Sequence, residues 1–108
     1  MNYALRAFVI GLLLFVLALP ALADTAKGQG VYMNFCTSCH ANGIAGAPVT
    51  GNKAEWQERS AKGTEVIIRN ALTGFQGKSG FMPAKGGNSA LTDEEVTAAF
   101  MYMQDQSK

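Results

Sequence analysis

The sequence predicts a small all-α domain with three main helices, additional short helices and long loops. Apolar residues recur at helical spacing in three stretches, within residues 25–35, 64–73 and 92–103. Between them lie two glycine-rich segments, residues 41–52 and 74–87, whose composition favours turns. No alternating pattern of useful length indicates a strand. We therefore expect helices joined by long irregular loops.

The segment 1–23 resembles a secretion signal. Arg6 gives a weakly positive start, and residues 7–19 are uncharged and mostly apolar, a stretch too short to span a bilayer comfortably. After Pro20, the segment 21–23 has the small-large-small pattern that a signal peptidase accepts. We expect cleavage before Asp24, a periplasmic location and no stable membrane insertion. The alternative is an uncleaved membrane anchor.

Cleavage would leave a single domain, residues 24–108, with eight basic and eight acidic residues. A balanced charge gives no indication of a nucleic-acid partner. A domain this small has a marginal core unless a disulfide, a metal or a cofactor supports it. In an oxidising compartment, the two cysteines would by default suggest a disulfide.

Each predicted helix has local support. Val31, Tyr32 and Phe35 share one face of a first helix that runs into Cys36. A short helix over residues 55–60 and a longer one over 64–73 follow, the latter stopped by a glycine. The last helix has the clearest start, since Thr92 and Glu95 form a capping box, and it shows one apolar stripe: Val96, Ala99, Phe100 and Met103.

The motif Cys36-Thr37-Ser38-Cys39-His40 is the C-x-x-C-H pattern of c-type haem attachment. At a helix end, this spacing lets both thiols reach one porphyrin edge while the adjacent imidazole turns toward the iron. The motif predicts one haem c per chain, covalently bound through Cys36 and Cys39, with His40 as an iron ligand. A thioredoxin-like disulfide would need a strand before the motif, and a structural zinc site would need a fourth ligand.

The second axial ligand is predicted to be Met82. It lies in a glycine-rich segment well beyond His40 in the chain, directly before Pro83, which restrains the backbone. Met33 is too near His40 in sequence to reach the opposite face. Met101 and Met103 lie on the last helix, where core packing is the expected role, at least for Met103.

Two protein ligands leave the iron no open position, which favours electron transfer over catalysis. We therefore expect a one-electron carrier of the respiratory type, not an enzyme, acting as a monomer. The alternatives are a small cytochrome subunit of a periplasmic oxidoreductase complex, and a haem enzyme or gas sensor with an open iron.

The chain resembles the class I bacterial cytochromes c, and most closely the cytochrome c5 group. The resemblance covers nearly all of residues 24–108 and is carried by these residues: Cys36 to His40, Ala41-Asn42-Gly43, Gly46-Ala47-Pro48, Trp56, Arg59, Met82-Pro83, Lys85-Gly86-Gly87 and Tyr102-Met103. It implies the small cytochrome c fold, wrapped around the haem. Some members carry a second cysteine pair where this chain has Asn88 and Leu91, so no disulfide is expected there.

The same resemblance implies roles for further residues. The carbonyl of Pro48 should accept the Nδ1 proton of His40, and Trp56 and Arg59 should line the propionate side of the haem. The N-terminal and C-terminal helices should cross, with Gly28 and Tyr32 meeting Tyr102.

The expected partners are redox proteins, donors and acceptors, that make brief contact with an exposed haem edge. Such interfaces are small. The rim of this edge should include residues 41–48 and 75–85. Lys53, Lys78 and Lys85 are candidate charges for steering partners toward it.

Overall fold

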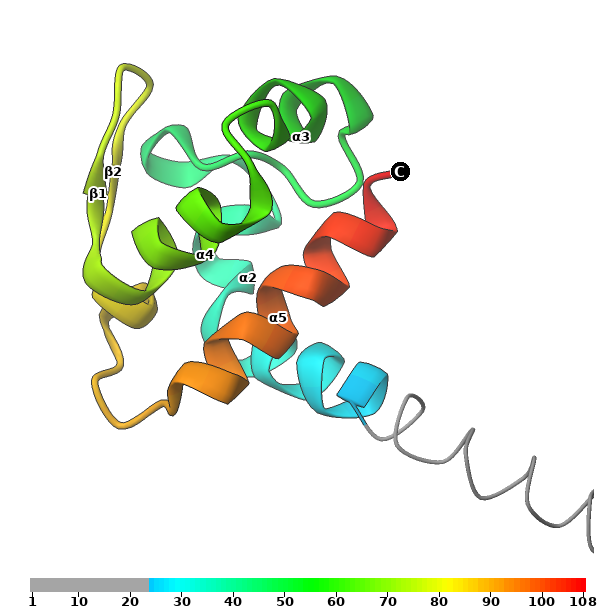
Figure 1. Cartoon of the computed structure of the whole chain (residues 1–108), viewed down its shortest axis with the longest axis vertical. Helices are drawn as coiled ribbons and strands as arrows, with labels where there is room; N and C mark the ends of the chain where they lie inside the picture. Colours follow the sequence, from blue (N-terminus) through cyan, green and yellow to red (C-terminus); the bar gives the residue numbers. More distant parts are fainter. Residues whose placement is uncertain (1–23) are drawn as a thin grey trace, which may run out of the picture.

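Helices dominate the computed structural model, which describes residues 24–108 (Figure 1). The predicted signal, residues 1–23, lies outside the described residues. The elements are, in chain order, an N-terminal helix described over residues 24–35, α2 (Thr37–His40), the 3₁₀ helix η1 (Ile44–Gly46), α3 (Lys53–Ser60), α4 (Thr64–Thr73), β1 (Phe75–Gln76), β2 (Phe81–Met82), the 3₁₀ helix η2 (Ala84–Gly87) and α5 (Asp93–Gln106). In the described part of the chain, no helix is long and apolar enough to cross a membrane.

The N-terminal helix crosses α5, as predicted (Figure 1). Gly28 lies directly against the backbone carbonyl of Ala98, so that an added Cβ would overlap its oxygen. Further along the same helix, the ring of Tyr32 packs on Tyr102 with ring centroids 5.3 Å apart. A glycine at the closest point lets the two helix backbones approach, and the tyrosine pair stabilises the crossing beside it.

The start and the buried face of α5 also confirm the prediction. Thr92 Oγ1 accepts a hydrogen bond from Glu95 N at 3.1 Å, and Thr92 N donates to Glu95 Oε1 at 3.0 Å. These bonds hold the pKa of Glu95 below its usual value. The predicted stripe of α5 is buried in the core.

The middle of the chain differs slightly from the prediction. Helix α3 begins at Lys53, because the side chain of Asn52 accepts a hydrogen bond from Glu55 N at 3.2 Å and caps it. Helix α4 ends before Gly74, as expected, and packs against α5 and η2.

The all-α fold class is confirmed, but the prediction that residues 74–87 are irregular is wrong for two short stretches. Phe75 pairs with Met82, and Gln76 with Phe81, in a two-stranded antiparallel hairpin. Its turn is closed by a hydrogen bond from Gly77 N to Gly80 O at 2.9 Å. Such short strands cannot show alternation in the sequence, and the surrounding glycines mask the β propensity of the two phenylalanines.

The helix crossing generates the first testable prediction. Gly28→Ala should lower the free energy of unfolding by about 1–3 kcal/mol, because its Cβ would push the two helix backbones apart. The matched control is Gly30→Ala, on the same helix, where an added Cβ meets nothing within 4 Å. It should be neutral or stabilising by up to about 1 kcal/mol. Urea unfolding followed by far-UV circular dichroism measures both; equal losses would contradict the proposed close contact.

Candidate haem site

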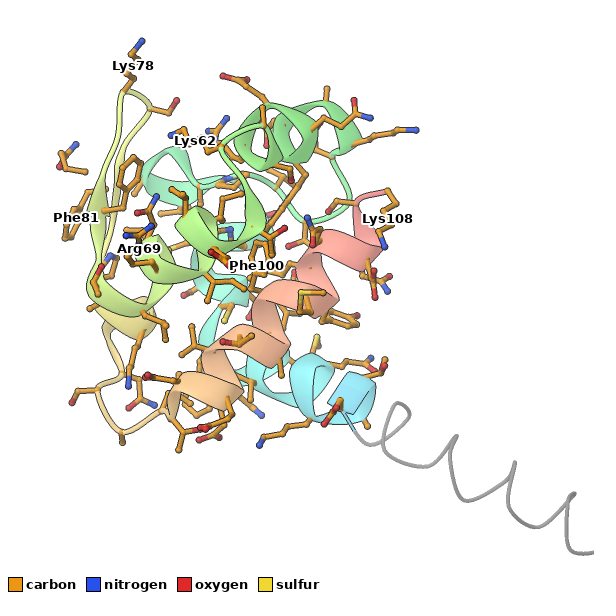
Figure 2. The ribbon with its side chains drawn as sticks, in the orientation of Figure 1. Lys62, Arg69, Lys78, Phe81, Phe100 and Lys108 are labelled. Carbon is orange, nitrogen blue, oxygen red and sulfur yellow. The ribbon has the colours of Figure 1, made fainter. Side chains whose placement is uncertain are left out.

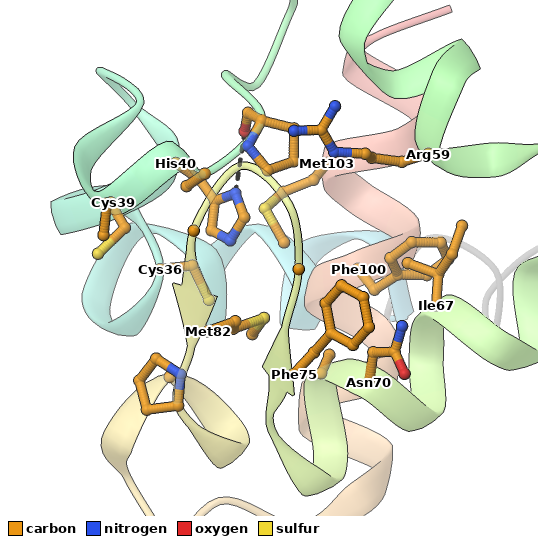
Figure 3. A pocket seen from close by; sticks show the side chains of 18 of the residues that line it. Cys36, Cys39, His40, Arg59, Ile67, Asn70, Phe75, Met82, Phe100 and Met103 are labelled. Carbon is orange, nitrogen blue, oxygen red and sulfur yellow. Dashed lines mark hydrogen bonds between the residues drawn. The ribbon is translucent and has the colours of Figure 1, made fainter. Parts of the chain in front are cut away.

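The C-x-x-C-H motif lies where the N-terminal helix passes into α2. His40 N donates to Cys36 O at 3.0 Å, so the helical path continues through the motif and sets its side chains around one turn. Cys36 and Cys39 are free and partly buried, and His40 is only 8% exposed. All three line a single cavity (Figure 3).

The imidazole of His40 is oriented by one hydrogen bond. Its Nδ1 lies 2.9 Å from the carbonyl oxygen of Pro48, shown dashed in Figure 3. Since a carbonyl oxygen can only accept, Nδ1 carries the proton and Nε2 keeps its lone pair in the neutral ring. Burial lowers the pKa of His40, opposed by this hydrogen bond, which raises it. The ring therefore offers a neutral Nε2, the form that binds a metal.

The cysteines lack the electrostatics of a redox-active pair. Burial, and secondarily the charge of Cys39, raises the pKa of the Cys36 thiol to about 11. Reactive C-x-x-C motifs have lowered thiol pKa values instead. Among residues 24–108, no three His, Cys, Asp or Glu side chains gather as zinc ligands would.

The cavity has a volume of about 710 Å³, within the range of roughly 300–1,000 Å³ typical of ligand and cofactor sites. Its walls come from every major element, with Phe75 and Met82 from the hairpin and Phe100 and Met103 from α5 (Figure 3). All the site residues that the sequence predicted line it: Cys36, Cys39, His40, Pro48, Trp56, Arg59 and Met82.

The methionines separate into two groups. Met82 and Met103 line the cavity. Met33 and Met101 are not among its lining residues, and they are 58% and 42% exposed. Met103 is buried within the apolar face of α5, whereas Met82 lies on a short hairpin strand. Two thioethers are thus available to the cavity, one fixed in the core and one carried by a hairpin.

Trp56 has a partner that the sequence did not indicate. Its indole Nε1 donates to Val49 O at 2.9 Å, and Val49 N donates to the carboxylate of Glu55 at 2.7 Å. Its ring is tilted against those of His40 and Phe100, with centroids 6.2 and 6.1 Å away. Helix α3 therefore holds the backbone next to Pro48 from both sides. We call this pair of hydrogen bonds, which joins Glu55 and Trp56 to the backbone of Val49, the clamp on Val49. The sequence gives no signal for it, because its acceptor and donor on Val49 are backbone groups.

The cationic side chains near the cavity make different contacts. Arg59 lines the cavity, and its Nη1 lies 3.6 Å from Glu58 Oε2. The Nζ of Lys62 lies over the ring of Phe75, 4.7 Å from the ring centroid. Lys85 donates to Leu91 O at 2.7 Å and pairs with Asp93 at 3.1 Å. Its ammonium group thus ties η2 to the start of α5. The steering role of Lys85 stays a prediction.

These donors fit a haem c. Two thiols, an imidazole with a free Nε2 and a thioether surround one largely apolar cavity large enough for a macrocycle. The same cavity has no comparable fit for a hard cation, which would require several oxygen ligands.

Comparisons with known proteins agree with this geometry. The family model described as cytochrome c oxidase, cbb3-type, subunit III matches residues 23–103. The chain is 47% identical to cytochrome c-555 of Chlorobaculum thiosulfatiphilum over 85 residues, covering 79% of this chain and 99% of the relative. It is 40% identical to cytochrome c-555 of Chlorobaculum tepidum over the full length of both chains.

Two further relatives lie at greater distance. Cytochrome c5 of Azotobacter vinelandii is 34% identical, with 71% of this chain and 90% of the relative covered. A solved chain from a structure titled "Crystal structure of electron transfer complex of nitrite reductase with cytochrome c" superposes with a TM-score of 0.66 at 33% identity, covering 76% of this chain and 95% of that one. The chain belongs to this cytochrome c family, as a class I, monohaem, c5-like member.

Proposed function

We propose that this protein is a periplasmic one-electron carrier whose haem c, attached to Cys36 and Cys39, is ligated by His40 and Met82. The observation that carries the proposal is the single cavity that receives the free Nε2 of His40, both thiols and the Met82 thioether. When bound, the haem iron supplies reversible exchange of one electron. The signal-like segment 1–23 supports export.

Met82 is favoured over Met103 by the elements that carry them. Met103 is a buried member of the core, whereas Met82 is only partly buried and packs against the edge of that core. Drawing the sulfur of Met103 toward a metal would therefore disturb the core more than the same change at Met82. Met82 lies on β2, directly before Pro83, and its strand partner Phe75 also lines the cavity. With His40 and Met82 on the iron, no position remains for a substrate or a gas, which favours a carrier over an enzyme.

The surface around the cavity is suited to brief contact with other redox proteins, because it exposes large apolar side chains. Ile44 and Phe81, both cavity-lining residues of the predicted rim, are 56% and 55% exposed, which is unusual for large apolar side chains. Lys78 lies at the tip of the hairpin, pointing away from the body of the domain (Figure 2). The solved relative named for its complex with nitrite reductase supports partners of this class.

A second candidate function is a small cytochrome subunit of a larger oxidoreductase. The matching family model, named for a subunit of an oxidase, favours it. Isolation of the native protein in a stable complex with a larger subunit would support this function over free diffusion.

The ligand assignment is tested by two matched methionine variants of the haem-loaded protein. Met82→Ala should abolish the weak absorption band from methionine sulfur to ferric iron, because the iron loses its thioether. Met103→Ala should keep this band and instead lower the free energy of unfolding by about 2–5 kcal/mol, as expected for a cavity in the core. Loss of the band in Met103→Ala alone would overturn the assignment.

The clamp on Val49 generates a separate prediction. Trp56→Phe removes the indole N–H but keeps an aromatic ring beside His40, so it should cost about 1 kcal/mol of unfolding free energy. The visible spectrum should stay that of a His/Met haem. A spectrum changed to a different axial ligand set, with stability unchanged, would contradict the holding role of Trp56.

A further inference from the structure

Two backbone segments that line the cavity and are far apart in the sequence meet directly. One is η1, which follows His40 and leads to Pro48. The other is the hairpin turn, residues 77–80, which leads into β2 and Met82. They meet at Gly46 and Gly80, and β2 itself also lies close to η1 in the arrangement of elements.

The contact is made by peptide groups and leaves no room for a side chain. A Cβ on Gly80 would overlap the carbonyl oxygen of Ala45 and lie 2.7 Å from its carbon. Reciprocally, a Cβ on Gly46 would overlap the carbonyl oxygen of Ser79 and lie 2.6 Å from its carbon. Because the opposing atoms are backbone, neither can swing aside as a flexible side chain would.

Each segment is fixed to the part of the site that it serves. On the His40 side, Gly43 N donates to Cys39 O at 2.9 Å, and the Pro48 carbonyl accepts from His40. On the other side, the hydrogen bond across the hairpin turn and the pairing of Phe75 with Met82 make the turn and β2 one unit. A shift at Gly80 must therefore be transmitted to Met82, which follows it closely in the chain.

We propose that the contact between Gly46 and Gly80 is a positioning device for Met82: it sets how closely the hairpin approaches the His40 side of the cavity. The inference rests on the proposed ligation by His40 and Met82. A hairpin held off by even one methyl group would move the thioether away from the iron and open this edge of the cavity to water and to other ligands.

Gly80→Ala is the cleanest test, because Gly80 is not among the glycines with a positive φ, so an alanine adds the close contact without left-handed backbone strain. The haem-loaded ferric protein is titrated with imidazole, which competes with a methionine ligand. We expect binding about tenfold tighter than in the wild type, with partial loss of the band from methionine sulfur to iron. Gly30→Ala, whose Cβ meets nothing, should bind imidazole like the wild type.

A second pair of variants, Gly46→Ala and Gly51→Ala, provides the test if the Gly80→Ala protein does not accumulate in the cell. Gly46 and Gly51 have similar positive φ angles, 77° and 97°, but an added Cβ at Gly51 meets nothing within 4 Å. Both variants place alanine at a positive φ, so tighter imidazole binding in Gly46→Ala alone would assign the effect to the contact with the hairpin turn and not to the change of backbone conformation. Equal imidazole affinity in the two variants, or wild-type affinity in Gly80→Ala, would overturn the inference.

Failure of the inference can be told apart from failure of the proposed ligation. If Met82→Ala loses the band while Gly80→Ala binds imidazole like the wild type, Met82 is the ligand and the glycine contact does not position it. If Met82→Ala retains the band, the ligation itself is wrong.

Discussion

The hydrogen bond from His40 Nδ1 to the carbonyl of Pro48 is the interaction on which the rest of the site depends. It selects the tautomer, aims the free Nε2 and ties α2 to the segment that follows η1. Much of the neighbouring structure maintains it. Helix α3 holds Val49 through Trp56 and Glu55, and the end of α5 reaches the same segment, since Gly51 N donates to Ser107 Oγ at 2.9 Å. One imidazole is thereby fixed by elements from the whole length of the domain.

The part of the cavity wall that carries Met82 is held in place differently. Met82 lies on a short strand that pairs with β1 and packs against the edge of the core, and the hairpin turn meets η1 through direct backbone contacts at Gly46 and Gly80. The site thus combines an imidazole held by several helices with a thioether on a short hairpin that is closed by its own backbone hydrogen bonds.

The sequence predicted the parts of this structure that local chemistry determines. The C-x-x-C-H motif, the capping box of Thr92 and Glu95 and the buried stripe of α5 each depend on residues close together in the chain. The resemblance to a family added the helix crossing at Gly28. The hairpin was missed because its strands are too short to show an alternating pattern. The hydrogen bond from Lys85 to Leu91 O was missed because any residue can supply a backbone carbonyl, so the sequence does not reveal this partner. The glycine contact between η1 and the hairpin joins segments far apart in the chain, which composition alone cannot reveal.

A haem anchored by both cysteines in the cavity that His40 and Met82 line is what we propose above all. The most direct measurement is the haem content of the protein exported by a host competent to attach haem, after extraction of the denatured chain with acidified acetone. We expect one haem per chain that stays with the polypeptide, on a mature chain beginning at Asp24. A colourless exported chain, or a pigment that is fully extracted, would contradict it.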